Sequence, residues 1–181
     1  IALSLGVLVT LLSMFDAIDV IAELQFERAY RDDVTVLFDA PRDEAALSEL
    51  RRLPGVLEAE GMRIVAARLE HGAVERRTAL TGLQPTAELR RIVDMDFERR
   101  ALPPDGLLMG RPLAEALGVA PGDSVHVEIT EGARPTARLP VAALVDEAIG
   151  GEVHLDVGAL RRLMREGTLH SGARLRIDPL E

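Results

Sequence analysis

The first fifteen residues, Ile1 to Phe15, carry no charged side chain, and this run constrains the fold more than any other feature of the chain. A membrane-spanning helix needs about 20 mostly apolar residues, so the run suits the outer part of a span. The sequence does not begin with Met, and we expect further residues before Ile1. Two alternatives stay open. One is a signal peptide, although this stretch lacks a basic segment and an A-x-A cleavage site. The other is a buried helix of a soluble protein.

Residues 16–30, which follow this run, contain no Pro or Gly and have an amphipathic pattern. The acidic side chains recur at helical spacing and form one narrow stripe, at Asp16, Asp19, Glu23 and Glu27. We therefore expect residues 1–31 to be the end of a first transmembrane helix and an amphipathic stalk. The stalk would carry the chain from the bilayer into water.

The face opposite this acidic stripe is apolar. Its members are Phe15, Ile18, Ile21 and Leu24. We predict that this face binds a hydrophobic cargo, together with the loop at residues 148–153, because an apolar face on a solvated stalk needs something to cover it. The alternative is that the same face only packs against other helices or the core.

The net charge and the absence of Lys and Cys exclude several functions. The chain has 30 acidic and 21 basic residues and a net charge of -9, which is opposite to what binding to nucleic acid requires. All of the basic residues are Arg. Without Lys there is no Walker A phosphate loop and no Schiff base, and without Cys there is no thiolate nucleophile, disulfide or thiolate zinc site.

Residues 32–61 predict the start of an α+β unit. A β-branched stretch at residues 34–38 is typical of a strand. Leucines at helical spacing over residues 43–53 predict a helix, with Asp43 as its cap and Pro54-Gly55 as its stop.

A long hairpin and a short helix are predicted next. From Met62 polar and apolar residues alternate on both sides of His71-Gly72, which predicts two strands joined by a short turn. In these strands we expect the charged side chains to face mostly solvent, at Arg63, Arg68, Glu75 and Arg77. A short helix is predicted over residues 87–93, and the Pro-rich stretch at residues 103–106 marks a boundary.

Residues 101–150 predict a compact β-rich unit. The sequence LLMGRPLAEALGVAPGDSVHVEI indicates a strand, a two-turn helix ended by Gly118, a turn at Gly122-Asp123 and a second strand. A further strand follows, with Pro140 at an edge or bulge. After it, a helix is predicted over residues 157–166, ended by Gly167. A last strand over residues 173–178 is expected to rejoin the first sheet.

We predict no catalytic, metal or cofactor site. The four histidines have no helical partner at metal-ligand spacing: His71, His126, His154 and His170. No G-x-S-x-G sequence occurs and the carboxylates are scattered, so we expect that the chain is not an enzyme. A small hydrolase that uses scattered carboxylates is the alternative. The pairs Arg76-Arg77 and Arg90-Arg91 are predicted to be solvated, with contact to lipid phosphate as the alternative.

The order of these segments resembles the periplasmic region of FtsX-like, MacB-type ABC permeases. The resemblance rests on the amphipathic helix after the apolar run, on RRLPGVLEAEGMR, and on LPPDGLLMGRPLAEALGVAPGDSVHVEI, and it covers essentially the whole chain. It implies an α+β fold in which a porter-like mixed sheet with helices (residues 32–100 plus 151–181) is interrupted by a small β-rich inserted lobe (residues 101–150). A long N-terminal helix would precede both.

The same resemblance implies a location and partners. Such a domain lies between two membrane helices of the cytoplasmic membrane and faces the periplasm or the cell exterior, so a second span would follow Glu181. A cytoplasmic ATPase, membrane lipid and a second permease in a homodimer would be its partners. Its task would be to move or export a lipid, lipoprotein or small amphiphile, or to signal outside the membrane. Members that reach an outer-membrane channel usually have longer external domains, so we do not expect this domain to engage such a channel. A soluble or lipid-anchored periplasmic binding module is the alternative.

Overall fold

The computed structural model describes residues 29–146 and 152–179. The predicted cargo face at Phe15, Ile18, Ile21 and Leu24, and most of the loop at residues 148–153, lie outside these ranges. Among the described helices, none has the length and apolarity that crossing a membrane requires.

The described elements are strands and short helices. The strands are β1 (Val34–Arg42), β2 (Val56–His71), β3 (Val74–Leu83), β4 (Leu107–Gly110), β5 (Ser124–Ile129), β6 (Thr136–Val145), β7 (Val153–Asp156) and β8 (His170–Ile177). The helices are α2 (Glu44–Leu50), α3 (Arg111–Leu117) and α4 (Val157–Met164). The predicted mixture of helices and sheet is therefore observed.

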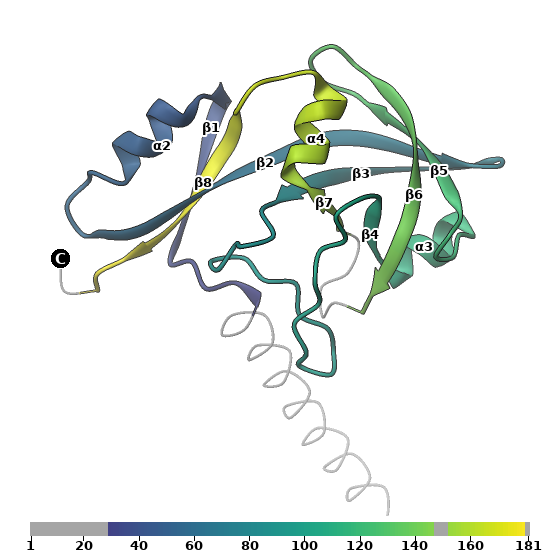
Figure 1. Cartoon of the computed structure of the whole chain (residues 1–181), viewed down its shortest axis with the longest axis horizontal. Helices are drawn as coiled ribbons and strands as arrows, with labels where there is room; N and C mark the ends of the chain where they lie inside the picture. The colour runs from purple at the N-terminus through teal and green to yellow at the C-terminus, as the bar shows by residue number, and fades with distance from the viewer. Residues whose placement is uncertain (1–28, 147–151, 180–181) are drawn as a thin grey trace, which may run out of the picture.

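These strands form one sheet in the order β1-β8-β2-β3-β7-β4-β6-β5, and β5 also pairs with β2. The second pairing closes six of the described strands into a barrel, while β1, β8 and the first half of β2 extend from it as an antiparallel sheet. Figure 1 shows the long β2 running through both parts, with α2 over the end formed by β1 and β8.

The barrel interior is filled by aliphatic side chains because its strands alternate inward and outward residues. In β2, Val65, Ala67 and Leu69 point inward and are buried. The other buried residues of this core come from every barrel strand and from the two neighbouring helices: Leu80, Leu107, Met109, Ala114, Leu117, Val119, Val125, Val127, Ile129, Val141, Val153, Leu155, Leu160 and Met164. A second cluster between α2 and the three-stranded sheet contains Leu47, Ala59, Ala173 and Leu175.

Several predicted elements are confirmed. The Asp43 side chain accepts a hydrogen bond from the Ala45 amide at 3.1 Å and caps α2. His71 pairs with Val74 to close the β2–β3 hairpin, and Gly118 ends α3 in the left-handed conformation at φ +68°. The last strand, β8, pairs with both β1 and β2, as expected.

Several boundaries differ from the prediction, and β2 begins at Val56, before the predicted start at Met62. β1 extends to Arg42 instead of ending at residue 38. The helix α4 ends at Met164 because Arg165, not Gly167, takes the left-handed position, at φ +54°.

The strands predicted to form an inserted lobe do not make a sheet of their own. From residues 101–150, β4 pairs with β7 and β5 pairs with β2, so they complete the barrel together with strands from the other predicted lobe. The two predicted lobes therefore share one sheet.

Candidate functional site

A buried charged cluster lies where the first described residues meet the sheet. We call this cluster the N-terminal junction, and its members are Tyr30, Arg90, Glu152 and Arg174. Tyr30 follows the predicted stalk, Arg90 lies in the irregular segment after β3, Glu152 precedes β7, and Arg174 lies in β8. Four distant parts of the chain therefore meet around one aromatic ring.

The geometry of the N-terminal junction is that of two cations on an aromatic ring. The Arg90 guanidinium carbon lies 4.2 Å from the centroid of the Tyr30 ring, and that of Arg174 lies at 5.7 Å. The Tyr30 hydroxyl donates to Glu152 Oε1 at 3.1 Å, and Arg90 Nη2 donates to Glu152 Oε2 at 3.3 Å. Because Arg90 contacts both the ring and the carboxylate, and Arg174 lies over the same ring, the backbone at Tyr30 is held against the sheet.

Burial gives this cluster its electrostatic character. Arg90 is 4% exposed and Arg174 is 8% exposed. Burial, and then repulsion from Arg90, lowers the pKa of Arg174 despite the nearby acids Asp32 and Glu152. Burial also raises the pKa of Tyr30, which keeps its hydroxyl protonated as a donor to Glu152.

The prediction of a helix over residues 87–93 is wrong, because the backbone of this segment forms other contacts beside the N-terminal junction. The Glu60 carboxylate accepts hydrogen bonds from the amides of Glu88 and Leu89, at 2.7 and 3.0 Å. The Arg31 amide donates to the Leu89 carbonyl, and the Arg91 amide donates to the Ala29 carbonyl. Backbone groups that a helix would pair internally are thus used to bind the incoming chain to β2.

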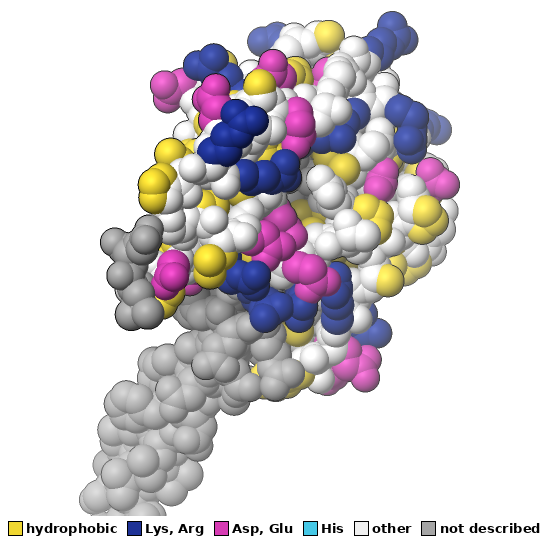
Figure 2. Space-filling view, turned by 60° about the vertical axis from the view of Figure 1, so that its left-hand side comes forward, with side chains coloured by type: hydrophobic (Ala, Val, Ile, Leu, Met, Phe, Trp, Pro, Cys, Tyr) yellow, Lys and Arg dark blue, Asp and Glu magenta, His cyan; other side chains and the backbone are white. Residues whose placement is uncertain are grey.

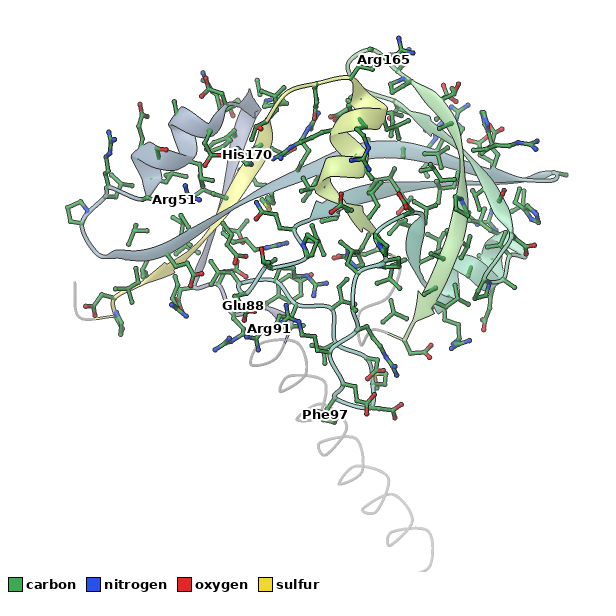
Figure 3. All side chains as sticks on the ribbon, viewed as in Figure 1. Arg51, Glu88, Arg91, Phe97, Arg165 and His170 are labelled. Atoms are coloured by element: carbon green, nitrogen blue, oxygen red, sulfur yellow. The ribbon has the colours of Figure 1, made fainter. Side chains whose placement is uncertain are left out.

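Ion pairs on the outside of the same segment reinforce this attachment. Glu88 pairs with Arg91, with Arg99 at 3.0 Å and with Arg31 at 3.9 Å. Hydrogen bonds from Arg91 and Arg99 lower the pKa of Glu88. Figure 3 shows Glu88 and Arg91 close together beneath the sheet. Surface pairs of this kind add little stability individually, so their main effect is to fix the position of the segment.

The loop after this segment is ordered by the buried carboxylate of Asp94. It accepts from the amides of Asp96 and Glu98, each at 3.0 Å, and pairs with Arg100. Burial alone would raise the pKa of Asp94, but these donors outweigh it and hold the pKa below its usual value. The loop presents Phe97, at its lower end in Figure 3, which packs against the apolar cluster of Ala29 and Val93.

The start of β1 and the end of β8 lie side by side. The Asp33 amide donates to the Leu175 carbonyl at 2.9 Å, and the Asp33 carboxylate accepts from the Ile177 amide at 2.9 Å. The Asp178 amide donates to the Gly55 carbonyl at 2.7 Å. The chain therefore enters and leaves the sheet on neighbouring strands.

The solvent exposure predicted for two arginines is wrong. Arg90 is buried in the N-terminal junction, and Arg63 is buried at 3% exposure in a separate ion cluster. Arg76 and Arg77 are exposed, as predicted. Figure 2 shows basic and acidic side chains interspersed over one face, without a broad patch of either sign.

Three of the remaining polar candidates contact other groups of the fold. Asp123 accepts from the Ala120 amide at 2.8 Å within the predicted turn. His71 contacts the Leu117 carbonyl at 3.3 Å, and His170 contacts Glu44 at 2.9 Å. Within residues 29–146 and 152–179, no group of three His, Asp or Glu side chains is arranged to hold a metal ion. The contacts of the N-terminal junction attach the incoming chain to the sheet.

Comparison with known proteins identifies the fold. No family model and no curated protein matches the sequence. Among solved structures, the extracellular domain of the noncanonic ABC-type transporter YknZ from Gram-positive bacteria is similar, with a TM-score of 0.50 and 13% identity over 78% of this chain and 75% of that chain. The periplasmic region of MacB from Actinobacillus actinomycetemcomitans has a TM-score of 0.49 and 10% identity over 78% of this chain and 67% of that chain, too distant to add to the comparison. At the level of fold, the resemblance inferred from the sequence is confirmed: the chain folds like the extracellular domain of a noncanonic ABC-type transporter.

Proposed function

We propose that the chain is the extracytoplasmic domain of an ABC transporter permease subunit. In this role it couples ATP hydrolysis in the cytoplasm to movement or export of a hydrophobic cargo, or to signalling outside the membrane. The observation that carries the proposal is the similarity in fold to the YknZ extracellular domain over 78% of the chain. The adjacency of Asp33, just before β1, and Ile177, at the end of β8, supports it, because a domain inserted between two membrane helices is entered and left on neighbouring strands.

The N-terminal junction supplies the mechanical part of this proposal. A displacement of the segment before Ala29 reaches the sheet through the backbone bonds of Ala29 and Arg31 and through the Tyr30 ring. A loosely tethered segment would dissipate the same displacement, whereas a packed and ion-paired contact transmits it. Two permeases in a homodimer, each attached in this way, would move their domains together.

The apolar face of Phe15, Ile18, Ile21 and Leu24 remains our proposal for the cargo contact. It lies just before the N-terminal junction in the sequence, so cargo held there would be moved by the same displacement. A lipid, a lipoprotein or a small amphiphile is the class of cargo that an apolar face selects.

Purification of the natural protein from its own membrane tests this role. We expect a tagged form to require detergent for extraction and to bring an ATP-hydrolysing subunit or domain with it. The expected ATPase activity should be lost when the catalytic glutamate of that ATPase is replaced by Gln. Extraction in buffer alone would instead support a soluble binding module, and extraction by detergent without any ATPase activity would support a lipid-anchored one.

A further inference from the structure

A cleft of about 720 Å³ lies between the end of β1, the β5–β6 turn and the C-terminal end of α4. Its rim is apolar: Leu37 is 70% exposed, and Phe38 and Leu169 are half-buried. A volume of this size is in the range of ligand-binding clefts. The rim therefore exposes apolar surface that a bound ligand would remove from water.

The floor of the cleft is a buried ion cluster centred on Arg63. Arg63 Nε and Nη2 donate to Glu166 Oε1 and Oε2 at 2.7 and 3.0 Å, and Nη1 lies 2.9 Å from Glu131 Oε1. Nη1 also donates to Ser171 Oγ at 2.9 Å and to the Ile64 carbonyl at 3.1 Å. The two carboxylates are therefore held in place from below by one guanidinium.

The net contribution of this cluster to stability is expected to be small, because a buried ion pair gains little over apolar residues of the same volume. Burial would lower the pKa of Arg63, but Glu166 and Glu131 outweigh that effect and raise it, so the guanidinium stays charged. What the cluster provides is two fixed carboxylates at the bottom of an apolar cleft.

The charge of the cleft favours a cation. The lining contains three acidic side chains, Asp39, Glu131 and Glu166, and the single base Arg63. Arg63 uses an acceptor position on three of the four oxygens of Glu131 and Glu166, and each carboxylate oxygen has two such positions. A basic side chain that enters the cleft would thus meet both unbalanced charge and acceptor capacity.

The wall of the cleft is an open strand edge. β1 stands at the end of the sheet and, among the described residues, pairs only with β8. Its register shifts between Leu37 and Arg42, and the residues between them, 38–41, have no Cα partner in β8 and line the cleft. An open edge of this kind can pair with the main chain of an incoming extended peptide.

From these three features we infer that the cleft binds an extended segment of a partner protein in which a basic side chain alternates with apolar ones. The main chain pairs with β1, the apolar side chains cover Leu37 and Phe38, and the basic side chain reaches Glu131 and Glu166. This inference goes beyond the transport role and does not depend on it, because the cleft is formed entirely by described residues.

Binding of a designed probe tests the inference. The probe is an acetylated, fluorescein-labelled hexapeptide that alternates valine with arginine, and its Kd for the full 181-residue chain is measured by fluorescence anisotropy. We expect Glu131→Gln to weaken binding about tenfold, since a charge-assisted hydrogen bond is lost. Leu37→Ser, which leaves the ion cluster intact, is expected to weaken it by a similar factor. Glu49→Gln, an exposed acid on α2, is the matched control and should leave Kd unchanged.

Three results would overturn the inference. The first is equal binding of a hexapeptide that alternates valine with glutamate. The second is equal binding of octylamine, which has a cation and an apolar tail but no main chain to pair with β1. The third is unchanged Kd in Leu37→Ser when thermal melting shows that this variant is folded. Slower amide hydrogen exchange at Leu37 to Ala40 on peptide binding is the expected sign of strand pairing.

Discussion

Gly172→Ala is expected to lower the free energy of unfolding by about 3 kcal/mol, at the upper end of what overpacking costs. A Cβ at this position would lie 2.2 Å from the Val36 carbonyl oxygen and 2.8 Å from Met62 Cε. The methionine can move, but the carbonyl belongs to β1, where Leu37 pairs with Gly172. The strand must therefore shift, and the β1–β8 pairing is lost.

Urea unfolding followed by circular dichroism measures this loss. Gly167→Ala is the matched control, because no heavy atom lies within 4 Å of a Cβ built there. We expect the control to unfold within about 0.5 kcal/mol of the original chain. Equal stability of the two variants would mean that β1 does not pair with β8 as described.

Arg90→Ala is expected to lower the free energy of unfolding by about 2–4 kcal/mol, somewhat less than the full cost of breaking a buried ion pair. The change removes the cation over the Tyr30 ring, leaves a cavity beside it, and removes the arginine partner of Glu152, which keeps its hydrogen bond from the Tyr30 hydroxyl. The cost stays below the upper limit because Glu152 is 38% exposed and partly hydrated, and because repulsion between Arg90 and Arg174 disappears. Arg90→Met, which keeps most of the packing, should cost less.

The neighbouring residue provides the control. Arg91 is half-buried and pairs with Glu88 near the surface, so Arg91→Ala should change stability by less than about 1 kcal/mol. The same urea titration compares the two. If Arg90→Ala and Arg91→Ala unfold at the same urea concentration, the buried cluster at Tyr30 does not hold the chain to the sheet.

The sequence predicts local elements well where one residue type decides the outcome. Asp43 before a leucine pattern, Gly118 after one, and the His71-Gly72 turn each fix a boundary through backbone geometry, and each lies where expected. The closure of the barrel is not predictable in this way. The pairing of β2 with β5 joins residues such as Leu69 and Val127, far apart in the sequence, and depends on the curvature of the whole sheet.

The burial of Arg63 and Arg90 was not predicted, and only Arg63 lies in a sequence pattern that indicates it. Arg63 shares its alternation with Val65, Ala67 and Leu69, so its side chain has to point to the same face as the core residues. Arg90 has no such pattern, because its burial depends on Tyr30 and Glu152, which come from distant segments. A local pattern cannot show which charges will find partners across the fold.

The location of the domain outside the cytoplasm is tested most directly by labelling a single cysteine in the natural protein, with any other cysteines replaced. Ala73, exposed at the tip of the β2–β3 hairpin, is changed to Cys, and Val127→Cys, buried in the barrel, is the control. With a membrane-impermeant maleimide on intact spheroplasts, we expect Ala73→Cys to react without permeabilisation and Val127→Cys to react only after denaturation. Reaction of Ala73→Cys only after the membrane is broken would contradict an extracytoplasmic permease domain.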